Sequence, residues 1–177
     1  LFSGDLAGYA KNTMTGDTTA AIDGVWNVTG DLTVQALHSD TANVNADALK
    51  ATLVGASATL AENTIRNGVE GGTSVRAAGA KINGSGNVEM TARNNITIGN
   101  EEEYGVEGSG YGGVAVQAAL LKNNVAKTAL VDLGNANILS QGAQSYSAQT
   151  VGDMTVGGYI KAAGAGAFSV VAVDNDM

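Results

Sequence analysis

The 177 residues of the chain include no cysteine and no proline, and few of them are aromatic or charged. Without cysteine, no disulfide stabilises the fold, and no thiolate is available as a nucleophile or a metal ligand. Aromatic residues make up 5% of the sequence and charged residues 15%, so we expect neither a core of large rings nor dense surface ion pairs. The hydrophobic fraction of 44% still predicts a folded chain, because disordered segments combine low hydrophobicity with high charge.

The charge balance and the lengths of the apolar runs exclude two classes of partner. Nine basic side chains stand against 17 acidic ones, and the resulting net charge of −8 repels the phosphates of nucleic acid. No apolar run reaches the ~18 residues of a transmembrane helix. The first residues also lack the charged and apolar regions of a signal peptide. Because a strand pattern runs up to the last residues, we expect residues 1–177 to be a single segment of a larger protein.

The clearest positive signal is strict alternation of apolar and polar residues. Residues 30–36 (GDLTVQA) and 86–92 (GNVEMTA) both show the two-residue period of a half-buried strand. Gly30 and Gly86 head these segments, and Gly142 follows at the same spacing of 56 residues. The recurrence predicts a repeat.

A second marker gives a similar period. A polar residue followed by asparagine recurs at Asn12, Asn63, Asn123 and Asn175, with separations of 51, 60 and 52 residues, or 51 for the last if Asn124 is used. We divide each of these units into two or three coils, which gives roughly nine coils of about 20 residues, a length typical of solenoid repeats. Stacked coils need small residues inside and glycine or asparagine at corners, which matches the composition. The sequence therefore predicts an all-β solenoid, a parallel β-helix.

Two alternatives remain open at the level of single segments. Residues 48–53 and 114–121 contain good helix formers, but frequent glycine, valine and threonine and the lack of a capped 3.6-residue stripe favour strands. The pairs Asn94-Asn95 and Asn123-Asn124 are either ladders between coils or exposed turns.

Several motifs resemble a known family. Residues 30–36 (GDLTVQA), 112–118 (GGVAVQA) and 133–139 (LGNANIL), together with the pair Lys122-Asn123, are similar to the degenerate repeats of filamentous-haemagglutinin-like large exoproteins, including leukotoxin-like adhesins. The similarity extends over nearly the whole chain, although such motifs also occur in other β-helical adhesins. It implies a right-handed parallel β-helix that is exported by two-partner secretion or as an autotransporter passenger. It implies no catalytic residues.

Residues 99–113 depart from the repeat pattern, and we expect an irregular, protruding loop there. Consecutive glutamates flanked by glycines are solvent-exposed, and solenoids often carry variable function on such loops. The carboxylates could chelate Ca²⁺ and the tyrosines could contact a sugar or a protein; a merely solvated acidic loop is the alternative. The candidate binding residues are Glu101, Glu102, Glu103, Tyr104, Glu107 and Tyr111.

Catalysis is not expected. The arginines Arg66, Arg76 and Arg93 fall on separate segments, and His38, the one histidine, is expected on an exposed turn. No motif indicates a metal site, and we expect no cofactor.

These features predict a non-enzymatic segment of a bacterial exported surface protein, secreted or on the outer cell surface, that acts as an adhesin stalk or a host-cell-binding region. A fragment of a secreted cytotoxin that damages host membranes is the alternative. The expected partner is a protein or glycan receptor on a host-cell or bacterial surface. Open strand edges also predict end-to-end self-association.

Overall fold

A computed structural model describes residues 6–43, 45–51, 54–99, 105–111, 114–154, 157–163 and 168–176. All regular secondary structure in these ranges is β-strand, which confirms the predicted all-β class. The strands are β1 (Leu6–Gly16), β2 (Thr18–Ala21), β3 (Val25–Val28), β4 (Leu32–Ala42), β5 (Asn45–Ala51), β6 (Val54–Asn67), β7 (Thr73–Arg76), β8 (Lys81–Gly84), β9 (Val88–Ile98), β10 (Gly105–Tyr111), β11 (Val114–Ala126), β12 (Ala129–Asp132), β13 (Asn137–Ser140), β14 (Gln144–Met154), β15 (Gly157–Ala163) and β16 (Phe168–Asp176).

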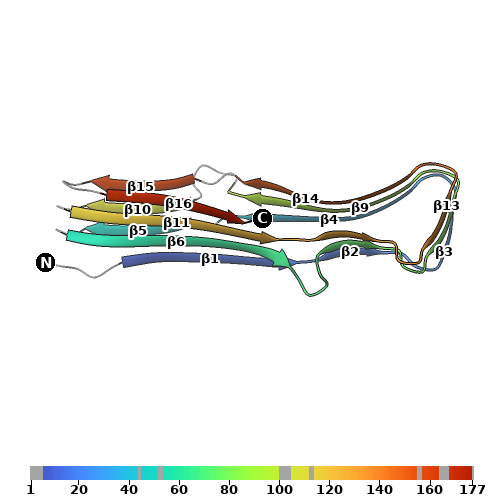
Figure 1. Ribbon diagram of the computed structural model, residues 1–177, viewed down its shortest axis with the longest axis horizontal. Helices are drawn as coiled ribbons and strands as arrows, with labels where there is room; N and C mark the ends of the chain where they lie inside the picture. The colour runs from blue at the N-terminus through green and yellow to red at the C-terminus, as the bar shows by residue number, and fades with distance from the viewer. Residues whose placement is uncertain are drawn as a thin grey trace.

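Each strand pairs in parallel with the strand five places further along the chain (Figure 1). One sheet has the order β1-β6-β11-β16, and four three-stranded sheets hold β5-β10-β15, β2-β7-β12, β3-β8-β13 and β4-β9-β14. We call β1–β5 the first layer, β6–β10 the second and β11–β15 the third; β16 lies on β11. The described chain is thus a stack of layers with parallel strands, as in a solenoid.

The strand register confirms both spacing markers. Strands β4, β9 and β14 pair 56 residues apart, which is the spacing of Gly30, Gly86 and Gly142. The asparagines of the second marker lie in one row across β1, β6, β11 and β16, with the third at Asn123.

The predicted coil of about 20 residues is not the unit that pairs. Residues in register lie 51 to 60 positions apart, so one layer takes the whole of the longer period. The division failed because several strands are long: β6 alone has 14 residues and β4 has 11, and each layer passes through five sheets. The nine predicted coils are accordingly not observed among the described residues.

The alternation predicted for β4 and β9 is confirmed by burial. Val34 and Ala36 point inward from β4, and Val88, Met90 and Ala92 point inward from β9, all in one apolar cluster. Val75 and Ile82 from β7 and β8 complete its centre and are fully buried. Burial of each such side chain stabilises the fold by about 1.5–3 kcal/mol.

A second apolar cluster lies further along the long strands. It contains Ala42, Ile65, Ile96, Ile98 and Val125. On β4 and β9, the inward positions between the two clusters carry His38, Asp40 and Asn94 instead of apolar residues. The interior is therefore apolar at both ends of these strands and polar between them.

One corner of each layer requires glycine. Gly24, Gly79 and Gly134 stand in the turns before β3, β8 and β13, with φ of 75°, 82° and 48°. This left-handed conformation is disfavoured for residues with a Cβ atom. The recurrence at the same corner explains part of the high glycine content.

The row that begins at Gly30 has a different requirement, which is close approach. A Cβ atom on Gly86 would lie 2.5 Å from the backbone carbon and oxygen of Gly30 in the layer below. Side chains beside this row bond to the next layer: Asp31 Oδ1 accepts from Asn87 N at 2.7 Å, and Asn87 Oδ1 accepts from Ala143 N at 2.9 Å. Glycine thus lets the layers come close enough for these bonds.

The segments with open alternatives are strands. Residues 114–121 lie within β11, and most of 48–53 lies in β5. Residues 105–111 of the predicted irregular loop form β10, which pairs with β5 on one side and β15 on the other. This part of the segment therefore continues the layered pattern. Residues 100–104 and 112–113 lie outside the described residues.

Candidate functional site

The candidate binding residues of the 99–113 segment fall partly outside the description. Glu101, Glu102, Glu103 and Tyr104 lie outside the described residues. Glu107 and Tyr111 belong to β10: Glu107 is in register with Asp47 and Tyr159, and Tyr111 with Ala51 and Ala163. Their role in binding stays a prediction.

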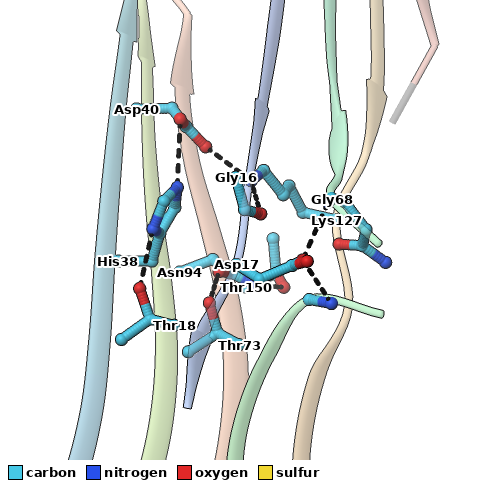
Figure 2. Close-up of polar contacts among 12 residues, drawn as sticks. Gly16, Asp17, Thr18, His38, Asp40, Gly68, Thr73, Asn94, Lys127 and Thr150 are labelled. Carbon is cyan, nitrogen blue, oxygen red and sulfur yellow. Dashed lines mark hydrogen bonds and ion pairs between the residues drawn. The ribbon is translucent and has the colours of Figure 1, made fainter. Parts of the chain in front are cut away.

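The most distinctive chemistry of the described residues is a buried polar cluster inside the layers, built around Lys127 and Asp40 (Figure 2). Lys127 follows β11 in the third layer, and Asp40 lies on β4 in the first. Lys127 Nζ is 3.1 Å from Asp40 Oδ2, with side-chain exposures of 0% and 6%. The ammonium also donates to the Gly16 carbonyl oxygen at 2.8 Å. The lysine therefore connects the third layer to the first through the interior.

His38 continues this cluster on the other side of Asp40. Its Nε2 lies 3.1 Å from Asp40 Oδ1, and its Nδ1 lies 2.9 Å from the hydroxyl oxygen of Thr18. Asp40 Oδ2 accepts no hydrogen bond within the described chain, so the Lys127 ammonium alone balances that oxygen there. The arrangement is a line of hydroxyl, imidazole, carboxylate and ammonium groups through which protons can move.

The predicted position of His38 is wrong. It lies within β4 and points inward with its side chain 18% exposed, whereas we expected an exposed turn. The alternation that places Leu32, Val34 and Ala36 inside continues to His38 and Asp40. Extending the two-residue period by four positions would have found both residues.

Asn94 adds a neutral branch to the cluster. It is in register with His38 on one side and Thr150 on the other. Thr73 donates its hydroxyl hydrogen to Asn94 Oδ1, and Asn94 Nδ2 donates to Thr150 Oγ1 at 3.1 Å. Asn94 is buried, so of its two readings the ladder between layers is correct.

Asn123 also belongs to a ladder. Asn63 Nδ2 donates to Asn123 Oδ1 at 2.9 Å, and both side chains are at most 1% exposed. The two asparagines lie in the middle of β6 and β11, not at turns. Buried amides that bond along the stack fix the relative register of neighbouring layers, because a shift by one residue would leave them unpaired.

Asp17 organises the loop that connects β6 to β7. Its Oδ1 accepts from Gly68 N at 2.8 Å and from Gly72 N at 2.7 Å, and its Oδ2 accepts from Glu70 N at 2.6 Å. Desolvation acts to raise the pKa of Asp17, but these backbone hydrogen bonds, with a smaller contribution from the charge of Lys127, hold the pKa below its ordinary value. The loop extends away from the layers (Figure 1), and Val69 in it is 99% exposed.

A groove runs across the layers at the corner that follows β3, β8 and β13. It has a volume of about 520 Å³. Equivalent positions of the three layers line it: residues 27–29, 83–85 and 139–141. Amide and hydroxyl side chains predominate and none is charged; Asn83 Nδ2 donates to Asn27 Oδ1 at 3.0 Å. None of the lining residues belongs to the buried polar cluster.

Other kinds of site find no support in the described ranges. They contain no group of three or more histidine, cysteine, aspartate or glutamate residues that could hold a metal ion. Nor does any helix of the described chain have the length and apolar character needed to cross a membrane.

Comparison with known proteins adds no assignment. No protein-family model, curated protein or solved structure matches the chain significantly. The resemblance to large exoproteins therefore stays a prediction from the sequence motifs.

Proposed function

We propose that the chain is a segment of a right-handed β-helix from a bacterial exported surface protein, secreted or held on the outer cell surface. It acts without catalysis, as an adhesin stalk or a host-cell-binding region. The supporting observation is the same order of five strands in successive layers, each strand in parallel register with the next layer. The motif resemblance to large exoproteins points to export.

The layered architecture suits a stalk for a physical reason. Every layer hydrogen-bonds to the next along all of its strands, so bending the stack breaks many bonds at once. At about 4.8 Å per strand spacing, three layers extend for only ~14 Å. Additional layers lengthen such a stack without changing its cross-section, which is how a repeat protein becomes a long rod.

The groove at the β3-β8-β13 corner supports a binding role. Its neutral amides and hydroxyls can both donate and accept hydrogen bonds, which suits the hydroxyl groups of a glycan. The exposed side chain of Leu139 adds an apolar surface for a sugar ring or a protein side chain. The proposed receptor on a host-cell or bacterial surface is therefore an uncharged glycan or a glycosylated protein.

A binding assay with two matched variants tests this function. We expect the purified chain to bind host cells or a glycan array. Asn83→Ala combined with Gln141→Ala, both in the groove, should reduce that binding at least tenfold. Thr33→Ala combined with Gln35→Ala, which removes two exposed side chains of β4, should leave it unchanged. No binding by the unmodified chain to any cell or glycan would contradict the adhesive function.

The cytotoxin alternative is separated by a leakage assay. Dye release from receptor-free liposomes by low concentrations of the chain would favour it over the stalk. We expect no release.

Self-association is a further part of the proposal. Within the described residues, β2–β4 and β12–β14 each pair with a strand on one side only, which leaves backbone groups open on both faces of the stack. We expect end-to-end oligomers in sedimentation velocity at high protein concentration. A monodisperse monomer would contradict this part.

A further inference from the structure

We propose that Lys127 and Asp40 form an intramolecular amide bond, a covalent cross-link between the third and first layers. The inference rests on the placement of a primary amine against a carboxylate in the protein interior, and it holds whatever the chain binds. The cross-link would give a protein without cysteine a covalent connection across its layers.

The two groups are held in contact and away from water. Lys127 Nζ is 3.1 Å from Asp40 Oδ2, and the lysine side chain is wholly buried. Asp40 is in register with Ile96 in the next layer, and Ala42 is the following inward residue of β4; both are buried in the second apolar cluster. The carboxylate therefore borders an apolar region.

A surface pair in the same chain shows the contrast. Lys11 Nζ lies 3.6 Å from Glu62 Oε1, with side-chain exposures of 48% and 24%. Water stabilises both charges there, and hydrolysis of any amide would be favoured by the surrounding solvent. Lys127 and Asp40 lack that solvation, and a buried ion pair carries a large desolvation penalty that a neutral amide does not. Burial therefore shifts the balance from the ion pair toward the amide.

The condensation balances within the cluster. The ammonium of Lys127 first loses a proton, and its lone pair then attacks Asp40 Cγ to form the carbon–nitrogen bond. A second proton leaves the nitrogen, the carbon–oxygen bond to Oδ1 breaks, and Oδ1 departs with both protons as water. One positive and one negative charge disappear together, and no oxidant or other reactant is needed.

His38 and Gly16 are placed to assist. His38 Nε2 lies 3.1 Å from Asp40 Oδ1, so it can deliver the proton that makes this oxygen a leaving group, and the Thr18 hydroxyl at Nδ1 holds the ring. The Gly16 carbonyl oxygen accepts a hydrogen bond from Lys127 Nζ at 2.8 Å and keeps the nitrogen beside the carboxylate. Effective concentration in such fixed geometry replaces an activating reagent.

Mass spectrometry of the purified, folded chain tests the cross-link directly. We expect the intact mass to lie about 18 Da below the mass of the sequence, which is the loss of one water. Trypsin should then release residues 12–50 joined to residues 123–161, with no cleavage after Lys127. Lys127→Arg and Asp40→Ala should restore the full mass, whereas Lys81→Arg, which changes an exposed lysine, should retain the loss.

The peptide map excludes a different dehydration. The sequence Asp23-Gly24 can lose water by forming a succinimide, which gives the same mass change within a single peptide. A full-length mass equal to that of the sequence would overturn the proposal, and the measurement on the unmodified chain does so without any variant that must fold. A mass loss that persists in Lys127→Arg or maps to residue 23 would overturn it equally.

Discussion

The close contact of successive layers at Gly86 makes a quantitative prediction. Gly86→Ala would place a methyl group 2.5 Å from the backbone of Gly30 and 2.4 Å from Asp31 Oδ1, so the layers must separate or the turn must shift. Inserting atoms into such a packed site costs about 1–3 kcal/mol. The shift would also weaken the hydrogen bond from Asn87 N to Asp31.

Gly84→Ala is the matched control, two residues earlier in the chain. A Cβ atom there would meet no atom closer than 3.9 Å, and the backbone of Gly84 is not in the left-handed region. Alanine at such a position stabilises by about 0.4–1 kcal/mol, because it reduces the entropy of the unfolded chain. The two variants should therefore differ by about 2 kcal/mol or more in the free energy of unfolding.

Urea unfolding followed by circular dichroism measures this difference. With a slope of about 2 kcal/mol per molar urea, the unfolding midpoints of the two variants should lie about 1 M apart. Equal midpoints would refute the close packing of layers at this row. A lower midpoint for Gly84→Ala than for Gly86→Ala would do so more strongly.

Three further predictions concern the interior and the loop. Ile82→Ala should lower the free energy of unfolding by about 2–5 kcal/mol in urea unfolding, because Ile82 is fully buried in the first apolar cluster; a loss below that range would contradict its central position. Asn63→Ala should cost about 1–3 kcal/mol in the same assay, because Asn123 loses a buried partner, and an unchanged midpoint would contradict the ladder. Asp17→Asn should speed amide hydrogen exchange at Gly68 and Glu70. Because the folded-state pKa of Asp17 is lowered, its stabilising effect is present above the unfolded pKa of about 4 and is lost as the pH falls through the folded value; the difference between Asp17→Asn and the unmodified chain should therefore vanish in acid.

Much of the layered architecture could be predicted from local pattern alone. The alternation at residues 30–36 and 86–92 gave the inward faces of β4 and β9, and the glycine and asparagine spacings gave the register. These signals are strong because stacked layers place equivalent residues in equivalent surroundings, so the same residue types recur. The size of the layer was missed because a general repeat length was preferred to the spacing that the sequence itself displayed.

The polar cluster could be predicted only in part. His38 and Asp40 continue an alternation that the sequence shows, so their inward direction was within reach. The contact of Lys127 with Gly16 joins residues 111 positions apart, and its direction through the layers depends on side-chain reach rather than on any periodic signal. The groove stands between these cases, since residues 27–29, 83–85 and 139–141 align once a period near 56 is applied to a corner.

The loop between β6 and β7 has a consequence for engineering. Before it, the first two layers are offset by 51 residues, and after it by 55, yet β7 still pairs with β2 and all following strands stay in register. The second layer thus holds extra residues that the stack accommodates by directing them outward, where Val69 is almost completely exposed. Epitope tags or short peptides grafted at Val69 should be displayed to solvent without disturbing strand pairing, which makes this corner a natural point for presenting foreign sequence on the protein.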